Sequence, residues 1–134
     1  MLFRSRRDAS GDVLAFDRLE DVLLANIAKM IPKGRVDVAG IMHTGSDLIA
    51  DSLTVIRAQF DGPLSAYPDS GYFAAPDWRF VDVISHDALQ QFYIDWLRQG
   101  VRVIGGCCGT GLPHIRAAAA ARDAFAAARE AMPG

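Results

Sequence analysis

The sequence predicts an α/β fold built on a parallel sheet. Short apolar runs, typical of buried strands, alternate with longer stretches in which apolar residues recur at helical spacing. Repeated strand–helix units imply parallel strands that are joined by right-handed crossovers. No linker interrupts the 134 residues, so we interpret residues 1–134 as a single domain.

The beginning of the chain predicts a strand end, a turn and a first helix. Residues 1–3 can end a strand, and Ala-Ser-Gly at residues 9–11 predicts a turn. Asp17 and Glu20 resemble a capping box in which Asp replaces Ser or Thr, and the helix they open ends at Pro32. The apolar stripe of this expected helix is Leu19, Val22, Leu23, Ile27, Met30 and Ile31.

The middle of the chain predicts two strands around a second helix. Residues 36–42 form a short apolar run, as expected of a buried parallel strand. A turn at residues 44–46 leads into a helix over residues 48–60, which Gly-Pro at residues 62–63 ends. The next strand is expected at residues 64–67.

A long loop and a third helix follow. Residues 68–85 are rich in Pro, Asp, Gly and aromatic residues, and loops of this length in a compact domain are usually functional or contain unassigned structure. Ser85 fits the N-cap of a helix whose apolar residues step at helical intervals. Gly100 stands where a glycine commonly follows a helix end.

The last unit predicts a strand, a glycine-rich turn and a final helix. Residues 101–104 are the strand, and residues 105–111 are the turn. Pro113 fits the first turn of a helix, and the alanine-rich run to Met132 strongly favours helix.

Composition and charge exclude several function classes. With 51% hydrophobic and 22% charged residues the chain is not a disordered tail, and its net charge of −2 argues against nucleic-acid or membrane-surface partners. No apolar run approaches the roughly 20 residues that span a bilayer, and no apolar segment follows the first arginines as in a signal peptide. We therefore expect a cytoplasmic protein.

Three strand ends carry the residues that suggest chemistry. In a parallel α/β fold the carboxyl ends of the strands share one rim, where sites gather. His43 ends one strand, Asp69 and Ser70 follow the next, and the adjacent pair Cys107 and Cys108 follows the last. Adjacent cysteines do not readily form a disulfide with each other, because their geometry does not suit it.

The residues alone leave the role of this rim open. Cys107, Cys108 and His43 give three ligands and an open fourth position, which is the pattern of catalytic zinc. Alternatively, the cysteines are small buried residues, and His43 is a hydrogen-bonded residue of the rim. A third reading is that the glycine-rich turn holds a phosphate at the following helix. His114 stands at the start of that helix, near the cysteine turn. A role as an outer partner of the site is the alternative for it, but we interpret it as a surface histidine.

Three segments resemble the homocysteine S-methyltransferase family. Val-Ile-Gly-Gly-Cys-Cys-Gly-Thr-Gly-Leu-Pro-His-Ile over residues 103–115 is similar to the family's C-terminal signature. Tyr-Pro-Asp-Ser-Gly over residues 67–71 is similar to its Tyr-Pro-Asn-Ser-Gly motif. Gly-Ile-Met-His-Thr over residues 40–44 stands where the family has Gly-Ile/Val-Asn-Cys-Thr. The resemblance covers roughly residues 10–125.

The resemblance implies a fold and a metal. The family fold is a (β/α)₈ TIM-type barrel of about 250 residues, so this chain would hold only its last three to four βα units. The family holds zinc with three cysteines at the rim of the barrel. Two of these correspond to Cys107 and Cys108, and the third corresponds to His43, which exchanges an anionic ligand for a neutral one. Asp69 stands where the family has Asn.

The resemblance also implies a reaction. Zinc would deprotonate the thiol of homocysteine or a similar thiol, which then takes a methyl group from a sulfonium, ammonium or methyl-corrinoid donor to give methionine. Tyr67, Asp69 and Ser70 would contribute to substrate binding. No general base is needed on this chain.

The length implies an alternative. By the resemblance the first four βα units are missing, which leaves open sheet edges. We therefore expect a homo-oligomer or a partner chain that supplies the other half of the barrel. The alternative function is a non-catalytic or truncated half-barrel subunit.

Overall fold

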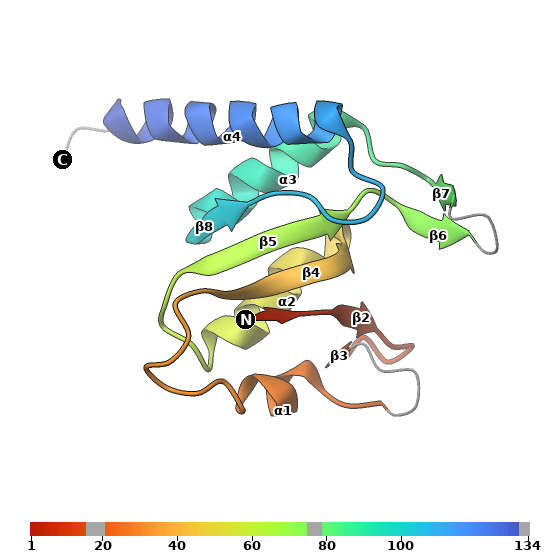
Figure 1. Ribbon diagram of the computed structural model, residues 1–134, viewed down its shortest axis with the longest axis vertical. Helices are drawn as coiled ribbons and strands as arrows, with labels where there is room; N and C mark the ends of the chain where they lie inside the picture. Colours follow the sequence, from red (N-terminus) through yellow and green to blue (C-terminus); the bar gives the residue numbers. More distant parts are fainter. Residues whose placement is uncertain (16–20, 75–78, 132–134) are drawn as a thin grey trace.

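A parallel four-stranded sheet forms the centre of the computed structural model, which describes residues 1–15, 21–74 and 79–131 (Figure 1). Its strand order is β1-β4-β5-β8, and every neighbouring pair is parallel. The predicted α/β class with a parallel sheet is therefore confirmed. The strands of the described residues are β1 (Leu2–Phe3), β2 (Ser5–Arg7), β3 (Val13–Ala15), β4 (Ala39–Gly45), β5 (Leu64–Asp69), β6 (Tyr72–Ala74), β7 (Arg79–Val81) and β8 (Val101–Ile104).

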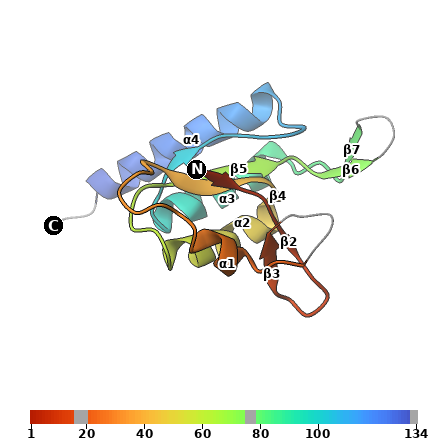
Figure 2. The same ribbon diagram turned by 60° about the horizontal axis from the view of Figure 1, so that its bottom comes forward.

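The helices form a layer on one side of this sheet and at its edges. The helices of the described residues are α1 (Leu24–Ala28), α2 (Ser46–Arg57), α3 (His86–Arg98) and α4 (Leu112–Glu130). Helix α2 packs on β4 and β5 and α3 packs on β8, while α1 contacts α2 and α4 contacts α3 (Figure 2). This open arrangement of βα units is compatible with part of a barrel.

The core lies between the sheet and helices α2 and α3. Ile41 of β4 and Ile49 and Ile56 of α2 are fully buried, as is Tyr93 of α3, and Trp96 is 1% exposed. The Tyr93 and Trp96 rings pack edge to face, with centroids 5.4 Å apart. Burying each large apolar side chain stabilises the fold by roughly 1.5–3 kcal/mol. This layer therefore fixes the strands whose ends carry the predicted rim.

The first helix is shorter than expected. The stripe predicted a helix that ends at Pro32, but α1 begins only at Leu24, and residues 16–20 lie outside the described residues. Val22 accepts a backbone hydrogen bond from Ala15 at 2.8 Å, and Leu23 forms a β-bridge with Leu14. This pairing with the end of β3 holds the chain extended, so it overrides the helical spacing. The strands β2 and β3 form a hairpin around the predicted turn.

The long loop contains a second hairpin. Strands β6 and β7 pair antiparallel within residues 68–85, and residues 75–78 between them are outside the described part. The long loop therefore contains structure that the sequence pattern did not assign. Beyond it, Ser85 caps α3 as predicted, because its Oγ accepts a hydrogen bond from the Ala88 N–H. Gly100 has a positive φ of 94° after that helix, as the pattern predicted.

The rim of the sheet positions the predicted residues. In Figure 1 the carboxyl ends of β4 and β5 point toward the side from which the β6–β7 hairpin projects, and the loop after β8 reaches the same side. Within the described residues, no helix is both long enough and apolar enough to cross a membrane.

Candidate metal centre

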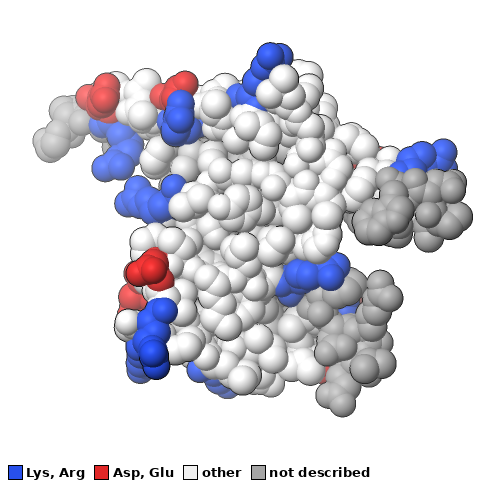
Figure 3. Space-filling model, viewed as in Figure 1, with Lys and Arg blue, Asp and Glu red and all other residues white. Residues whose placement is uncertain are grey.

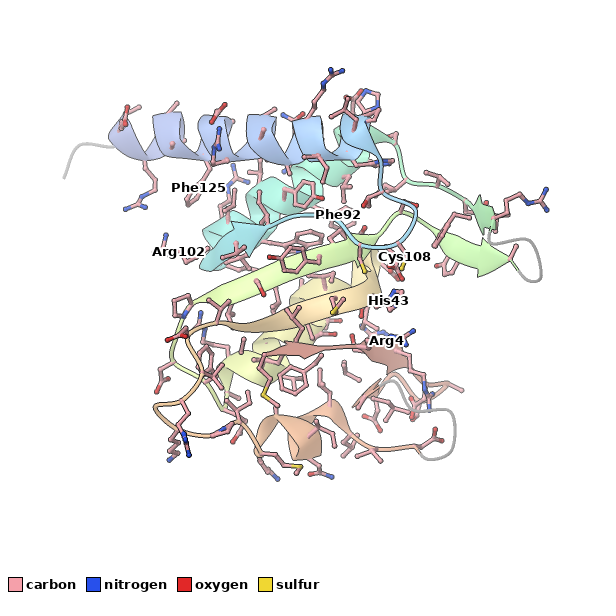
Figure 4. All side chains as sticks on the ribbon, in the orientation of Figure 1. Arg4, His43, Phe92, Arg102, Cys108 and Phe125 are labelled. Carbon is pink, nitrogen blue, oxygen red and sulfur yellow. The ribbon has the colours of Figure 1, made fainter. Side chains whose placement is uncertain are left out.

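Four side chains with metal-binding atoms meet at this rim. His43 comes from β4, Asp69 from the end of β5, and Cys107 and Cys108 from the loop between β8 and α4. One ligand atom from each lies within 4.8 Å of the others. Figure 4 shows the labelled His43 and Cys108 side by side where β4 and the loop meet. The topology thus brings together all three residues that the sequence suggested as metal ligands, and adds Asp69.

The backbone at His43 is unusual. The pairing of β4 with β5 shifts register between Met42 and Thr44, so His43 is an extra residue in the strand. Its φ is +57°, a left-handed conformation that few residues other than glycine adopt and for which His is among the more tolerant. Bulges of this kind turn a side chain out of the regular alternation, and backbone strain is concentrated at functional sites. Here the bulge accompanies an imidazole ring that lies against the cysteine loop.

Two of the three donor spacings match those of a tetrahedral zinc site, and the third, between His43 Nδ1 and Cys108 Sγ, is shorter. Cys107 Sγ and Cys108 Sγ are 3.8 Å apart, and His43 Nδ1 lies 3.7 Å and 3.1 Å from them. Zinc–sulfur bonds of about 2.3 Å and zinc–nitrogen bonds of about 2.0 Å place tetrahedral donors about 3.5–3.8 Å apart. Both cysteines are free thiols, as the adjacency predicted. Two soft sulfurs and one imidazole therefore suit zinc in chemistry as well as in spacing.

Asp69 binds both neighbours in the cluster. Its Oδ1 accepts a hydrogen bond from the Cys108 backbone N–H at 3.1 Å, and the same oxygen lies 3.1 Å from His43 Nδ1. The resemblance placed Asp69 on the substrate side. In the structure it lies between a histidine and the loop that carries the thiols.

Backbone hydrogen bonds hold the cysteine loop, residues 105–111, on the end of the sheet. The Gly105 N–H donates to Ala66 O at 3.1 Å, and the Cys107 N–H donates to Pro68 O at 2.9 Å. The Ser70 N–H in turn donates to Cys108 O at 3.0 Å. The loop thus continues the β5–β8 pairing beyond the strands, which fixes the thiols relative to β5.

These bonds also bear on the phosphate reading of the glycine-rich turn. A phosphate cradle needs free backbone N–H groups at a helix N-terminus. The amides of Gly105, Cys107 and Cys108 already donate to the end of β5, and the Thr110 amide donates to Cys107 O at 3.3 Å. Since these donors are taken, the arrangement favours a site built from side chains.

The cysteine loop needs glycine at position 109. Gly109 has φ +72°, and a Cβ there would overlap Ser70 Oγ and approach the Phe80 ring to 2.7 Å. The loop therefore packs directly on the turn after β5 and on the β6–β7 hairpin. Ser70 is 1% exposed beneath it.

Burial keeps the Cys108 thiol protonated when no metal is bound. Burial raises the pKa of the Cys108 thiol to about 11, and the hydrogen bond and charge of Cys107 and the charge of Asp69 add to this, while Arg4 opposes it. A cysteine with a raised pKa is a poor nucleophile at neutral pH. Figure 4 labels Arg4 beside His43 on this rim, and Figure 3, in the same view, shows the surrounding face to be largely uncharged.

The other residues that the resemblance assigned to substrate binding lie around the cluster. The Ser70 side chain is buried, and its Oγ has no hydrogen-bond partner among the described residues. Tyr67 is half-buried, with its ring against Gly105.

His114 is a residue whose place sequence reasoning missed. Its Nδ1 accepts a hydrogen bond from the Gly111 N–H at 3.1 Å, and its Nε2 lies 3.2 Å from Ile84 O. It therefore ties the end of the cysteine loop to the segment before α3. Gly111 is the N-cap residue of α4 and His114 is its N3 residue, and this three-residue spacing is the sequence signal for the capping contact between them.

Comparison with known proteins agrees with the resemblance. The sequence profile described as Homocysteine S-methyltransferase matches residues 13–122. Homocysteine S-methyltransferase 1 of Zea mays is 30% identical over 86 residues, covering 62% of this chain and 27% of the relative. Homocysteine S-methyltransferase 4 of Zea mays is 32% identical over 91 residues, covering 65% of this chain and 27% of the relative. The match thus spans little more than a quarter of either relative.

Proposed function

Because the chain belongs to the homocysteine S-methyltransferase family, we propose that its rim cluster is the zinc site of a methyl transfer to the thiol of homocysteine or a similar thiol. The observation that carries this proposal is the spacing of Cys107, Cys108 and His43, whose donor atoms lie 3.1–3.8 Å apart. A bound zinc ion would supply a Lewis acid that lowers the pKa of a coordinated thiol.

The chain's own residues prepare this site. Cys107 and Cys108 would give up their protons to hold the metal, so its affinity falls as pH falls. With His43 as the third protein ligand, a fourth position stays open for a substrate sulfur. Asp69, through its bond to the Cys108 amide, holds the loop in place before any metal arrives.

The reaction itself needs few protein groups. The substrate thiol loses its proton to solvent, its sulfur bonds to the methyl carbon, and the bond between that carbon and the donor breaks. The product thioether carries no negative charge and is a weak metal ligand, so it can leave. Sulfonium, ammonium and methyl-corrinoid donors all fit this scheme. Tyr67 and Ser70 stay proposals for the substrate side, and a reducing cytoplasmic setting would keep the two thiols free.

Zinc content of the purified full chain tests the site. We expect about one zinc ion per chain, as in three-ligand catalytic sites. Replacing either cysteine by serine, or His43 by alanine, should remove most of it. His86→Ala is the matched control, because His86 is exposed at the start of α3 and pairs only with Asp87 among the contacts described. Parent protein that binds no zinc, or Cys107→Ser that binds as much as the parent, would contradict the site.

Turnover tests the activity. The zinc-loaded chain is incubated with homocysteine and, in turn, a methylsulfonium compound, a quaternary methylammonium compound and methylcobalamin. Methionine formation that the Cys108→Ser variant lacks supports catalysis by this chain. Zinc binding without methionine from any donor would contradict activity of the chain alone and favour the second function below.

A half-barrel subunit is the second candidate function. The chain spans 27% of the length of the curated relatives it matches. In the described residues, β1 and β8 are the edges of an open sheet, and unpaired edges invite pairing with another chain. A second copy or a separate chain with the missing βα units would complete such a sheet.

Solution mass separates the two candidates. If the fold must be completed by another chain, sedimentation or light scattering of the full chain should show a dimer. Alternatively, these methods should show a monomer whose activity rises when a partner chain is added. A monomer that is stable and active by itself would exclude the subunit function.

A further inference from the structure

We propose that Thr44 is a positioning residue of the metal site, because its hydroxyl fixes the bulge that turns His43 toward the thiols. The inference rests on the proposed zinc site and deepens it. Thr44 is not one of the ligands. It acts through the backbone of β4, and it links this backbone to the first residues of the chain.

The hydroxyl of Thr44 spans the bulge. The register of β4 against β5 shifts between Met42 and Thr44, and His43 between them has φ +57°. Thr44 Oγ1 donates a hydrogen bond to Met42 O at 3.0 Å, so it joins the residues on either side of His43. Pro68, which lies opposite Thr44 in β5, has no N–H to give to the strand pairing. The hydroxyl therefore supplies a local bond at the point where the pairing is irregular.

Thr44 also receives a bond from the N-terminal segment. The N–H of Ser5, the first residue of β2, donates to Thr44 Oγ1 at 3.0 Å. The hydroxyl thus accepts one hydrogen bond and donates another, in a residue that is 3% exposed. Removing it would leave the Ser5 N–H and the Met42 carbonyl without this bond in a place that water hardly reaches.

The neighbouring hydroxyls fix the direction of these bonds. Ser52 Oγ of α2 donates to Leu48 O at 2.8 Å, so the 2.7 Å contact between Ser5 Oγ and Ser52 Oγ uses the Ser5 proton. Ser5 Oγ therefore has no proton left for Thr44 Oγ1, which lies 3.3 Å away. The Thr44 proton can reach Met42 O at 3.0 Å or Ser5 O at 3.4 Å. The shorter distance favours the bond that spans the bulge.

Thr44 and His43 lie in different surroundings. Thr44 is buried together with Ser5 and Ser52, which brings β4, β2 and α2 into contact. The His43 side chain is 32% exposed, and Figure 4 shows it beside Cys108 at the rim. Anchoring Thr44 on the buried side leaves the imidazole on the side of the cysteine loop. Without that anchor, β4 can relax toward a regular strand, in which His43 loses its left-handed backbone.

A purely structural role for this network is the competing interpretation. The same bonds attach the β2–β3 hairpin to the sheet, and they could serve that attachment alone. Loss of the Thr44 hydroxyl would then loosen residues 5–7 and leave the affinity for zinc unchanged. The two interpretations therefore differ in what happens to the metal site.

Zinc competition of the full chain tests the proposal. Affinity is measured against a chromophoric chelator for the parent, for Thr44→Val, which removes the hydroxyl, and for Thr44→Ser, which keeps it. A site whose binding conformation is populated one time in ten binds about tenfold more weakly, and we expect a loss of that order for Thr44→Val. Thr44→Ser should bind nearly as tightly as the parent. Thr54→Val is the matched control, because the Thr54 hydroxyl is exposed on α2 and donates to Ala50 O.

NMR of the metal-free chain separates positioning from a general loss of structure. The chain has three histidines, so the His43 ring can be assigned with the His86→Ala and His114→Ala variants. Nuclear Overhauser contacts between this ring and the cysteine methylene groups should be present in the parent and in Thr54→Val. In Thr44→Val they should weaken.

The outcomes distinguish this proposal from the zinc site. A Thr44→Val chain that keeps the ring contacts and binds zinc as tightly as Thr54→Val would overturn the role of Thr44 only. A parent that binds no zinc would overturn the zinc site, and the ring contacts of the metal-free chains would still test the positioning. If Thr44→Val does not fold, Thr44→Ser decides: binding like that of the parent supports a role for the hydroxyl, and a loss of about tenfold contradicts it.

Discussion

His43 shows how one backbone conformation can create a site. A regular β4 would alternate its side chains across the sheet, but the bulge at His43 breaks that alternation. The left-handed φ of +57° costs energy for a residue with a side chain, roughly 1–2 kcal/mol. The fold tolerates this cost where the imidazole lies within 3.7 Å of both sulfurs.

Gly109 carries a prediction at the same scale. Gly109→Ala should destabilise the fold and weaken zinc binding, because the new methyl group would overlap Ser70 Oγ and the Phe80 ring. Gly34→Ala is the matched control, since Gly34 has nearly the same φ of +69° with nothing within 4 Å of the added Cβ. Chemical denaturation of both variants separates the backbone strain of a positive φ, roughly 1–2 kcal/mol in each, from the overlap of the new methyl group. Equal losses of stability and unchanged zinc affinity would show that the loop does not depend on this close packing.

Tyr93 predicts a dependence of stability on pH. Burial raises the pKa of Tyr93 from 10.0 to about 12, and its hydroxyl donates a hydrogen bond to Gly105 O at 2.6 Å. Below pH 10 the phenol is neutral in both folded and unfolded chains, so its contribution is fully present. Between pH 10 and 12 the unfolded chain loses the proton more readily than the folded one, and the free energy of unfolding falls by at most about 1.4 kcal/mol per pH unit.

The Tyr93→Phe variant isolates this effect. It should be less stable than the parent at neutral pH by about 1 kcal/mol, the usual net value of one hydrogen bond. That difference should shrink as the pH rises through 10 toward 12, because phenylalanine does not ionise. Denaturant unfolding of both chains at several pH values checks it, and a difference that stays constant over this window would contradict the raised pKa.

At the scale of elements, the cysteine loop depends on its neighbours. His114 joins Gly111 to Ile84, and the Ile84 N–H donates to Ser70 O at 2.7 Å. The Ser70 N–H in turn donates a hydrogen bond to Cys108 O. The turn after β5, the segment before α3 and the start of α4 are therefore held together around the thiols.

His114→Ala should open this connection. The Gly111 amide would lose its acceptor and Ile84 O its donor, at a cost of roughly 0.5–1.5 kcal/mol for each hydrogen bond, because Gly111 is exposed and Ile84 is only partly buried. Hydrogen exchange at the Gly111 amide should speed up while exchange at the core strand β5 stays slow. His86→Ala serves as the control histidine. Unchanged protection of Gly111 would mean that the ring contact does not hold the loop.

The elements that could be predicted are those with strong local signals. The strand at residues 101–104, the Ser85 cap and the glycine after α3 all followed from sequence and are present in the structure. The prediction of where the first helix begins was wrong, because the pairing of Leu23 with Leu14 is a contact that helical spacing does not encode. The β6–β7 hairpin was missed for a similar reason, since its strands are three residues each.

The same distinction applies to the candidate site. That His43, Asp69 and the cysteines share a rim follows from the parallel topology, which the sequence predicted. The contact between His43 and Asp69 could not be predicted, since it depends on the register of β4 against β5 and on a bulge. The place of His114 also depends on an association between segments 27 residues apart in the chain, Ile84 and Gly111, which no local pattern reveals.

For the whole molecule, the metal site and the completeness of the fold are separate questions. The cluster is built from β4, β5 and the loop after β8, all of which this chain supplies. The matched region, however, spans only 27% of the length of the two curated relatives. We therefore predict that this chain binds metal by itself, and methyl transfer stays a proposal that the turnover experiment tests.

X-ray absorption at the zinc edge of the zinc-loaded chain tests the central claim most directly. The account predicts two sulfur neighbours at about 2.3 Å and the remaining neighbours, nitrogen or oxygen, at about 2.0–2.2 Å. Cys108→Ser should reduce the sulfur count by one. A first shell of nitrogen and oxygen alone, or one that keeps both sulfurs in Cys108→Ser, would contradict a zinc site formed by Cys107, Cys108 and His43.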